Sequence, residues 1–264
     1  MRIAIYQGPE LPQSIELNLR SLELYANEAA AQGANALIAP EMFLTGYNIG
    51  AQNIADLAET ADGESSRAIA EIAINAGIAV LYGYPESASG NVYNSAQVID
   101  INGQRLANYR KSHLFGDLDR NAFSAGNEAT VTFHLDGWQI GILICYDIEF
   151  PENVRNLALA GADFVAVPTA LMEPYHFVPN AMVPTRAYEN QIFIAYGNRC
   201  GEEKELRYCG LSCIVGPDGE DVARASASEE LIFATLDRSL LESSRKLNTY
   251  LEDRRPELYR DLRK

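Results

Sequence analysis

Three residues that can carry out chemistry each stand at the end of a predicted strand: Glu41, Lys111 and Cys145. Cys145 ends the apolar stretch WQIGILIC and precedes a helix start at Phe150-Pro151, so a strand-to-helix turn is expected there. At such a turn a thiol faces a crevice, and backbone N–H groups lower its pKa from about 8.5. A carboxylate that closes an apolar strand must reach solvent or serve in a crevice. An acid, a cation and a thiol at three strand ends therefore predict nucleophilic catalysis.

Each of these residues also has a simpler structural interpretation. Free cysteines are among the most buried residues and are usually inert, and Glu41 and Lys111 could form a buried ion pair without a catalytic duty. The other cysteines, Cys200, Cys209 and Cys213, have irregular spacings without a C-x-x-C pair, and the three histidines are scattered. We therefore predict neither a disulfide framework nor a metal site, and we interpret these three cysteines as packing residues.

The elements that would position the three groups alternate between strands and helices. Strand-like runs occupy residues 2–7, 36–41 and 78–84. Helical spacing of apolar residues extends from an N-cap at Ser14 to Gly33, and again over residues 64–76. This alternation is typical of α/β proteins.

Hairpins interrupt the alternation further along the chain. Asn-Gly and Asp-Gly dipeptides supply the positive φ angles of tight primed turns. They predict antiparallel pairs that turn at Asn102-Gly103, Asp136-Gly137 and Asp218-Gly219, with strands over 92–101, 104–111, 130–135 and 138–145. The remaining elements are helices at 151–160 and 177–188 and a buried strand at 162–168. We expect a single mixed α/β domain over residues 1–264, in which the segment from Leu240 onward packs on a partner or is solvated.

The composition restricts the function. The 264 residues are 47% hydrophobic and carry 36 acidic against 21 basic side chains, which gives a formal charge of −15. Nucleic-acid binding rests on Lys and Arg that neutralise phosphates, and anionic membranes attract basic segments. No apolar run approaches the roughly 18 residues of a spanning helix, and the start of the chain has no signal-peptide pattern. We expect a soluble, cytoplasmic protein that binds neither nucleic acid nor membrane.

Three sequence blocks resemble the signature of a known family. PEMFLTGYN surrounds Glu41, YRKSHLF surrounds Lys111 and ICYDIEFPE surrounds Cys145. Together with the later blocks PTALM and RAYEN, they are similar to the nitrilase superfamily of carbon-nitrogen hydrolases over essentially the whole chain. The resemblance implies a four-layer α-β-β-α sandwich with mixed sheets. It also implies a homodimer or higher homo-oligomer built on a helix-to-helix contact.

The resemblance also implies a role for each residue of the triad. Glu41 acts as general base, and Cys145 is the nucleophile that forms a thioester and releases ammonia from an amide. Lys111 stabilises the oxyanion and donates a proton, helped by the backbone N–H of Tyr146. This chemistry requires no metal and no organic cofactor.

A fourth group stands near the lysine in many relatives, where a second glutamate orients lysine and substrate. Asp119 occupies that place here, and its side chain is one methylene shorter. The alternative interpretation of Asp119 is an exposed loop carboxylate, and Asp117 is a weaker competitor for the role.

The substrate implied by the resemblance is a small aliphatic amide. The extended match is most similar to 5-aminopentanamidases of lysine degradation and to R-stereoselective amidases, which suggests hydrolysis of 5-aminopentanamide to 5-aminopentanoate and ammonia. Related ω-amidases commonly carry Arg where this chain has Glu149, and a carboxylate there favours a neutral or ammonium-bearing amide, whose approach the charge of −15 would assist. Alternatively, Glu149 is a structural partner of Arg155 or Arg186.

Other residues near the matched blocks are candidates for the pocket wall or for ordinary core. They are Phe43, Tyr47, Tyr146, Leu171, Met172 and Tyr175. Because the triad is shared, an ω-amidase, an N-carbamoyl amino acid hydrolase and a true nitrilase are alternative enzymes. A binding protein that keeps the fold without turnover is the alternative from another class.

Overall fold

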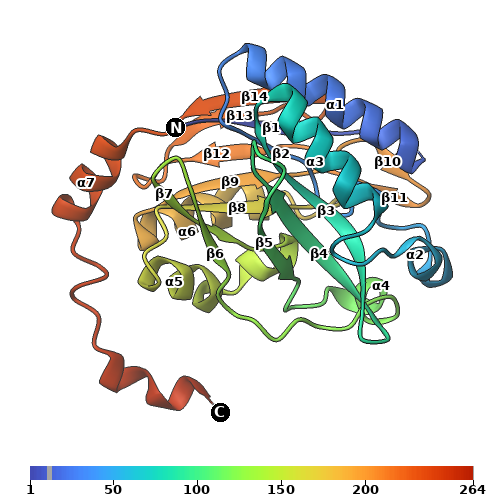
Figure 1. Cartoon of the computed structure of the whole chain (residues 1–264). Coiled ribbons are helices and arrows are strands. Elements are labelled where there is room, and N and C mark those ends of the chain that lie inside the picture. Colours follow the sequence, from blue (N-terminus) through green and yellow to red (C-terminus); the bar gives the residue numbers. More distant parts are fainter. Residues whose placement is uncertain (11–13, 264) are drawn as a thin grey trace.

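The computed structural model describes residues 1–10 and 14–263. Its strands form two six-stranded sheets, of order β14-β1-β2-β3-β4-β5 and β13-β12-β9-β8-β7-β6, and a short hairpin of β10 and β11 (Figure 1). The strand bounds are β1 Arg2–Gln7, β2 Ala36–Ile38, β3 Ala79–Ala88, β4 Asn91–Ile99, β5 Arg105–Arg110, β6 Thr132–Leu135, β7 Trp138–Ile142, β8 Phe164–Pro168, β9 Phe193–Gly197, β10 Glu202–Glu203, β11 Leu206–Arg207, β12 Cys213–Val215, β13 Asp221–Arg224 and β14 Glu230–Thr235.

Helices connect these strands. The α-helices are α1 Ile15–Ala31, α2 Ala51–Leu57, α3 Glu64–Ala76, α4 Gly116–Arg120, α5 Pro151–Leu159, α6 Val183–Asn190 and α7 Arg238–Leu247. Two 3₁₀ segments, η1 Cys145–Glu149 and η3 Pro256–Arg263, and a π-helical segment, η2 Val178–Met182, complete the elements. Ser14 accepts a hydrogen bond from the Leu17 N–H, which confirms the predicted N-cap of α1.

Both sheets combine parallel centres with antiparallel margins. In the first sheet β1, β2 and β3 run parallel, so that Ile38 lies beside Ile5 and Leu81. In the second sheet β7, β8 and β9 run parallel, and the outer strands of both sheets pair antiparallel. The predicted mixture of parallel and antiparallel pairing is confirmed.

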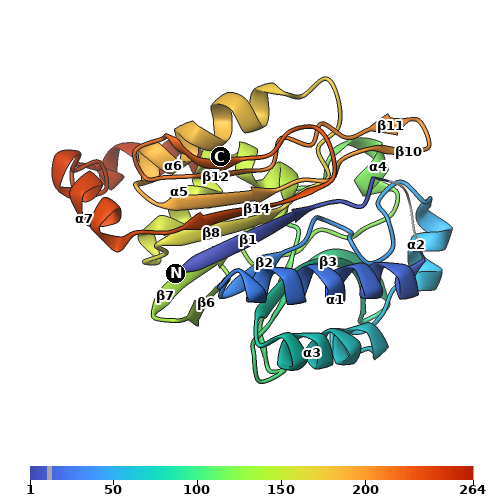
Figure 2. The same cartoon turned by 90° about the horizontal axis from the view of Figure 1, so that it is seen from above.

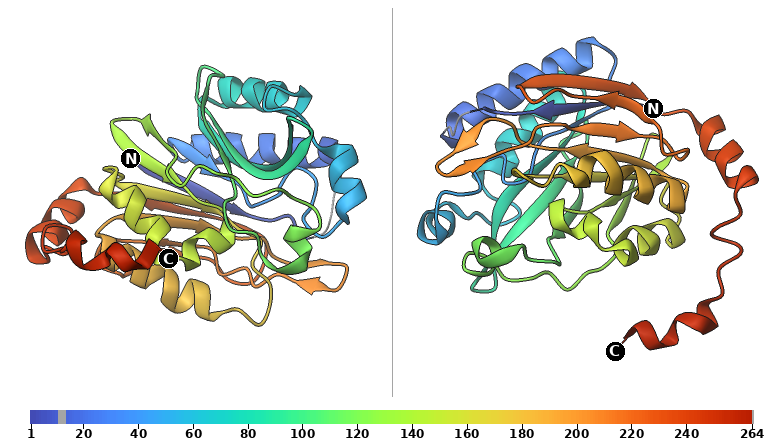
Figure 3. Two further views of the ribbon diagram at one scale, coloured as in Figure 1. Left: turned by 90° about the horizontal axis from the view of Figure 1, so that it is seen from below. Right: turned by 180° about the vertical axis from the view of Figure 1, so that it is seen from behind.

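The two sheets pack face to face between two layers of helices. Helices α1 and α3 cover the outer face of the first sheet, and α5 and α6 cover the second (Figure 2 and Figure 3). Between the sheets, the missing side chain of Gly197 on β9 makes room for Ile5 and Ile38, whose methyl carbons would lie 3.1 and 3.3 Å from a Cβ there. The predicted four-layer α-β-β-α sandwich is therefore confirmed.

Several strands are shorter than the sequence predicts, and the differences place the three chemical groups outside the sheets. The strand expected over 36–41 ends at Ile38, and the one expected over 138–145 ends at Ile142. In each case the chain leaves its strand so that a polar group does not lie in the apolar space between sheets. Glu41, Lys111 and Cys145 therefore sit in the connections that follow β2, β5 and β7.

Two local predictions need correction. The primed turn expected at Asn102-Gly103 is a longer loop in which only Gly103 has positive φ, because the Asp100 carboxylate accepts the N–H groups of Asn102 and Gln104. A turn with both central residues at positive φ is found instead at Asp136-Gly137. The helix expected over 177–188 is divided into η2 and α6. Sequence patterns did not predict α2, α4, β9, β10, β11, β14 or the helix α7, from which the C-terminal segment extends away from the sheets (Figure 1).

A substitution at Gly83 on β3 tests how closely the sheet packs against the turn that carries Glu41. Its N–H donates to the Pro40 carbonyl, and an added Cβ would lie 2.5 Å from the Met42 nitrogen. We expect Gly83→Ala to lower the free energy of unfolding by about 1 to 3 kcal/mol in urea denaturation, because the backbone must shift to admit the methyl group. Ser87→Ala on the same strand is the control, and equal midpoints for both variants would contradict the prediction.

Candidate active site

Lys111 lies between two buried carboxylates. Its Nζ donates hydrogen bonds to Glu41 Oε1 at 2.8 Å and to Asp119 Oδ2 at 2.7 Å, and all three side chains have no exposed surface. These bonds use two of the three ammonium N–H groups. The third has no hydrogen-bond partner within the described part of the chain.

One carboxylate oxygen of Glu41 accepts hydrogen bonds, and the other has no hydrogen-bond partner. Oε1 accepts from Lys111 and from Asn94 Nδ2, the latter at 2.7 Å, whereas the buried Oε2 has no hydrogen-bond partner. Burial raises the pKa of Glu41 above its usual value, although the charge of Lys111 acts in the opposite direction. A buried carboxylate with a raised pKa and a vacant oxygen can accept a proton.

Cys145 occupies a strained position between β7 and α5. It is the first residue of η1, it is 7% exposed, and its φ of 47° lies in the left-handed region that side chains rarely adopt. Burial, assisted by Glu41, raises the pKa of the thiol, and this outweighs the lowering effects of Lys111 and of the Ala170 backbone. The lowered pKa expected from the sequence is therefore wrong, because desolvation outweighs the backbone dipoles. The thiol keeps its proton and requires a base.

Asp119 is fully buried in the short helix α4, eight residues after Lys111. Besides Lys111, its carboxylate accepts the Tyr47 hydroxyl at 2.7 Å and the Phe115 N–H at 2.8 Å. The alternative of an exposed loop carboxylate is therefore wrong for Asp119. It describes Asp117 instead, whose 92% exposed side chain lies 3.9 Å from Arg120.

The residues predicted to line the substrate pocket differ in their burial and in their packing partners. Tyr47 is buried with its ring 5.7 Å from Lys111 Nζ, and it packs with Met42 and Met172. Leu171 is also buried, and its N–H donates to Asn198 Oδ1 at 2.7 Å. The half-buried Tyr146 packs edge-on against Phe115 and Phe150, and the exposed Tyr175 lies against Phe115, whereas Phe43 packs under the helices of the first sheet.

Glu149 carries a half-buried carboxylate without an ion pair or hydrogen bond in residues 1–10 and 14–263. Arg186 donates to the backbone carbonyls of Ile148 and Glu149 and pairs with Glu189 at 3.1 Å, and Arg155 donates to the Glu189 carbonyl. Neither arginine pairs directly with the Glu149 carboxylate, but Arg186 bonds to the Glu149 backbone, so the interpretation of Glu149 as a structural partner holds in part for Arg186 and is wrong for Arg155. Burial raises the pKa of Glu149, and the charges of Lys111 and Arg186 oppose this effect.

Sequence reasoning missed the groups that hold these residues in place. The buried Asp147 accepts hydrogen bonds from the Tyr109 hydroxyl and the Ser112 hydroxyl, both at 2.9 Å, and so joins the Lys111 connection to η1. Asn94 orients Glu41, and Glu203 binds the segment that carries Tyr47. Asp147 lies inside the matched block ICYDIEFPE, where its position could have drawn attention, whereas no sequence pattern indicates Glu203.

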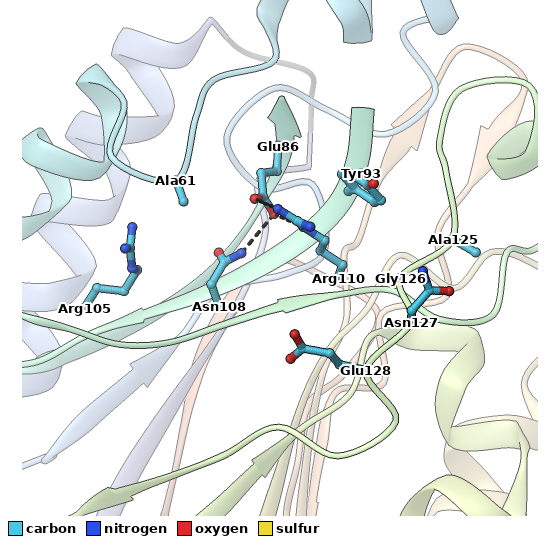
Figure 4. Close-up of a pocket in the computed structure, with 10 residues that line it drawn as sticks. All are labelled: Ala61, Glu86, Tyr93, Arg105, Asn108, Arg110, Ala125, Gly126, Asn127 and Glu128. Atoms are coloured by element: carbon cyan, nitrogen blue, oxygen red, sulfur yellow. Dashed lines mark hydrogen bonds and ion pairs between the residues drawn. The ribbon is translucent and has the colours of Figure 1, made fainter. Parts of the chain in front are cut away.

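A separate cavity of about 510 Å³ is lined in part by side chains from β3, β4 and β5 (Figure 4). Successive residues of a strand point to opposite faces, and Arg110 points into this cavity, where it pairs with Glu86. The lining residues are Ala61, Glu86, Tyr93, Arg105, Asn108, Arg110, Ala125, Gly126, Asn127 and Glu128. The cavity therefore contains none of the predicted site residues.

Other potential binding groups are sparse. Across the described ranges, no three His, Cys, Asp or Glu side chains gather closely enough to hold a metal ion. Cys200, Cys209 and Cys213 are buried free thiols. None of the helices that the structure describes is both long and apolar enough to cross a membrane.

Comparison with known proteins assigns this chain to a protein family. The sequence profile of carbon-nitrogen hydrolases matches residues 2–246. The chain belongs to the carbon-nitrogen hydrolase family. The predicted membership of the nitrilase superfamily is thereby confirmed. The prediction that this protein is an enzyme, a carbon-nitrogen hydrolase, is confirmed as well.

This hydrolase is similar to curated and solved proteins over its whole length. It is 56% identical to the "Hydrolase in pqqF 5'region" of Pseudomonas protegens, with 100% of this chain and 92% of that protein covered. It is 36% identical to a nitrilase of Pyrococcus abyssi, with 94% and 95% covered. The crystal structure of an amidase from Nesterenkonia sp. matches with a TM-score of 0.89 at 35% identity and covers 99% of this chain and 96% of that one.

Removal of the buried cation tests the electrostatics of the site. We expect Lys111→Met to lower the free energy of unfolding by about 3 to 5 kcal/mol near pH 8, because it leaves two carboxylates buried without a cation. Lys111 lowers the pKa of Glu41, so the substitution raises that pKa further above its unfolded-state value.

A carboxyl with a raised folded-state pKa binds its proton more tightly when folded, so the deficit relative to the unsubstituted protein should shrink as the pH falls. Urea denaturation at about pH 8 and about pH 5 measures the free energy of unfolding of the variant and of the unsubstituted protein at each pH. Lys246→Met on the exposed face of α7 is the control. A deficit that is absent, or that grows with acidity, would refute the prediction.

Proposed function

We propose that this hydrolase is an amidase that cleaves a small aliphatic amide through a thioester on Cys145. The observation that carries the proposal is the vacant, buried Oε2 of Glu41 in the same charged group as Lys111 and the protonated thiol. The relatives support it, because they include an (R)-stereoselective amidase from Pseudomonas sp. and a 2-oxoglutaramate amidase from Bacillus subtilis. The C145A mutant of the amidase from Nesterenkonia sp. AN1 binds butyramide, and acrylamide adds to the active-site cysteine of its E41Q mutant.

In the first half of the reaction, Glu41 Oε2 accepts the thiol proton and the sulfur of Cys145 attacks the amide carbon. The carbonyl π electrons move to oxygen. The resulting oxyanion accepts hydrogen bonds from the third N–H of Lys111 and from the Tyr146 backbone N–H near the start of η1. Fixed donors of this kind contribute about 3 to 4 kcal/mol to transition-state stabilisation.

In the second half, the proton on Glu41 passes to the amide nitrogen, the carbon–nitrogen bond breaks and ammonia leaves. A thioester on Cys145 remains. A water molecule then gives its proton to Glu41 while its oxygen attacks the thioester carbon, and the carbon–sulfur bond breaks. The carboxylic acid leaves as the proton on Glu41 returns to sulfur. Asp119 holds Lys111 in place through both halves.

The substrate that we propose is 5-aminopentanamide, which yields 5-aminopentanoate and ammonia as a step of lysine degradation. Glu149 supports this choice, because a half-buried carboxylate without a protein partner can bind the distal ammonium group. The charge of Lys111 acts on the pKa of Glu149, and Cys145 and Glu149 both act on the pKa of Tyr196, which supports a role for this carboxylate near the reacting groups. The net charge of −15 also attracts a cationic substrate.

We also propose a cytoplasmic homodimer or higher homo-oligomer built on the face of α5 and α6. Leu159 and Tyr188 support this interface, because they leave 49% and 40% of their surfaces exposed on that face.

Loss of the nucleophile gives the first test of the proposed mechanism. We expect Cys145→Ala to reduce ammonia release by at least about 1000-fold, because the remaining groups cannot form the thioester. The measurement is a coupled ammonia assay with butyramide and 5-aminopentanamide. Cys213→Ala in β12 should retain activity, and full activity of Cys145→Ala would disprove the mechanism.

A substrate panel tests the proposed substrate. We expect kcat/KM for 5-aminopentanamide to exceed that for pentanamide by about 10-fold or more, because a buried charge pair contributes more than about 1.4 kcal/mol. Glu149→Gln should remove this preference and leave pentanamide hydrolysis unchanged. Acidification should weaken it too, because the raised pKa of Glu149 lets this carboxylate take up a proton at less acidic pH than an ordinary glutamate.

The panel also includes 2-oxoglutaramate, an N-carbamoyl amino acid and a nitrile. Preference for 2-oxoglutaramate would exclude the proposed substrate and favour an ω-amidase. Glu152→Gln on the exposed start of α5 is the matched control for Glu149→Gln.

A further inference from the structure

The segment that contains β10 and β11 connects the two halves of the site. On one side, Arg199 Nη1 donates to the Met42 carbonyl, beside Glu41, at 3.2 Å. On the other side, the Cys209 N–H donates to the Leu171 carbonyl at 3.0 Å, next to Ala170. The segment therefore joins the connection after β2 in the first sheet to the connection after β8 in the second (Figure 1 and Figure 3).

Glu203 is a carboxylate buried in the centre of this segment. Only 2% of its surface is exposed. It accepts the Asn48 N–H at 2.7 Å, the Tyr47 N–H at 3.1 and 3.2 Å, and the hydroxyl of Tyr208. Among the residues that the structure describes, no cation pairs with it, so backbone N–H groups and one hydroxyl balance its charge.

The backbone beside Glu203 is shaped to admit the carboxylate. Gly46 has a φ of +92°, and a Cβ at this position would lie 2.4 Å from Glu203 Oε1. A side chain at Gly46 would therefore displace the carboxylate from the two N–H groups that follow. The turn at Gly46 and the Glu203 carboxylate therefore form one structural unit.

We propose that Glu203 is a positioning residue that acts on Lys111 through Tyr47 and Asp119; the inference rests on the amidase mechanism proposed above. Glu203 fixes the backbone of Tyr47, whose hydroxyl donates to Asp119 Oδ1 at 2.7 Å. The other oxygen of Asp119 accepts from Lys111 at 2.7 Å. Three consecutive contacts therefore relate Glu203 to the ammonium group that orients Glu41 and meets the oxyanion.

A double-mutant cycle with Glu203→Gln and Tyr47→Phe tests the inference. Glutamine has nearly the same size, but it offers only one acceptor oxygen to the two N–H groups. We expect Glu203→Gln to lower kcat by about 10-fold or more with KM within about threefold, because small displacements of reacting groups reduce the rate strongly. If Glu203 acts through Tyr47, the double variant should have about the kcat of the slower single variant.

A second readout does not depend on amide turnover. The rate at which acrylamide alkylates Cys145, followed by intact-protein mass spectrometry, should fall in Glu203→Gln and should also show the non-additive pattern. Glu202→Gln on the exposed side of the same hairpin is the control, and circular dichroism melting verifies that each variant is folded. If Glu203→Gln does not fold, Tyr208→Phe replaces it in the cycle, because this substitution removes one hydrogen bond to Glu203.

Two outcomes overturn the inference. One is a kcat and an alkylation rate for folded Glu203→Gln within about twofold of the unsubstituted protein. The other is multiplication of the two single effects in the double variant, which indicates that Glu203 and Tyr47 act independently. An unsubstituted protein that releases no ammonia from any amide contradicts the proposed function, and in that case the alkylation rates alone decide the role of Glu203.

Discussion

The buried contact between Lys111 and two carboxylates sets the conditions for the rest of the site. A lysine without exposed surface is stable only where anions compensate its charge, and Glu41 and Asp119 both do so. Each carboxylate in turn needs further donors, which Asn94, Tyr47 and the Phe115 backbone provide. The requirement to balance charge inside the protein therefore extends outward from one ammonium group through the surrounding connections.

The sandwich satisfies this requirement because its sheets stop before the polar residues begin. Parallel strands β2 and β7 end at Ile38 and Ile142, and the chain beyond them is free to form turns. Strands would have pointed these residues alternately to two faces. The turns instead direct Glu41 and the strained Cys145 into the same charged group, so that apolar layers supply rigidity and the connections supply chemistry.

The sequence was sufficient for most elements of the first 190 residues and for the three chemical groups, but not for β9, β14 or α7. Apolar periodicity and turn dipeptides are local signals, and the matched blocks place Glu41, Lys111 and Cys145 in register. Exact strand ends were not predicted, because solvation of a single polar residue decides them. The thiol pKa was predicted in the wrong direction because burial depends on distant segments. Glu203 was missed for the same reason, since its partners lie about 155 residues earlier in the chain.

The vacant oxygen of Glu41 has a consequence for the charges in the dry interior. When Glu41, Asp119 and Lys111 are ionised and the thiol is neutral, this group carries one net negative charge. Proton transfer from Cys145 to Glu41 moves that charge to sulfur, and attack on the amide moves it to oxygen. Each step relocates an existing charge around a fixed cation rather than creating a new one, and relocation avoids the large cost of charging a medium from which water is excluded.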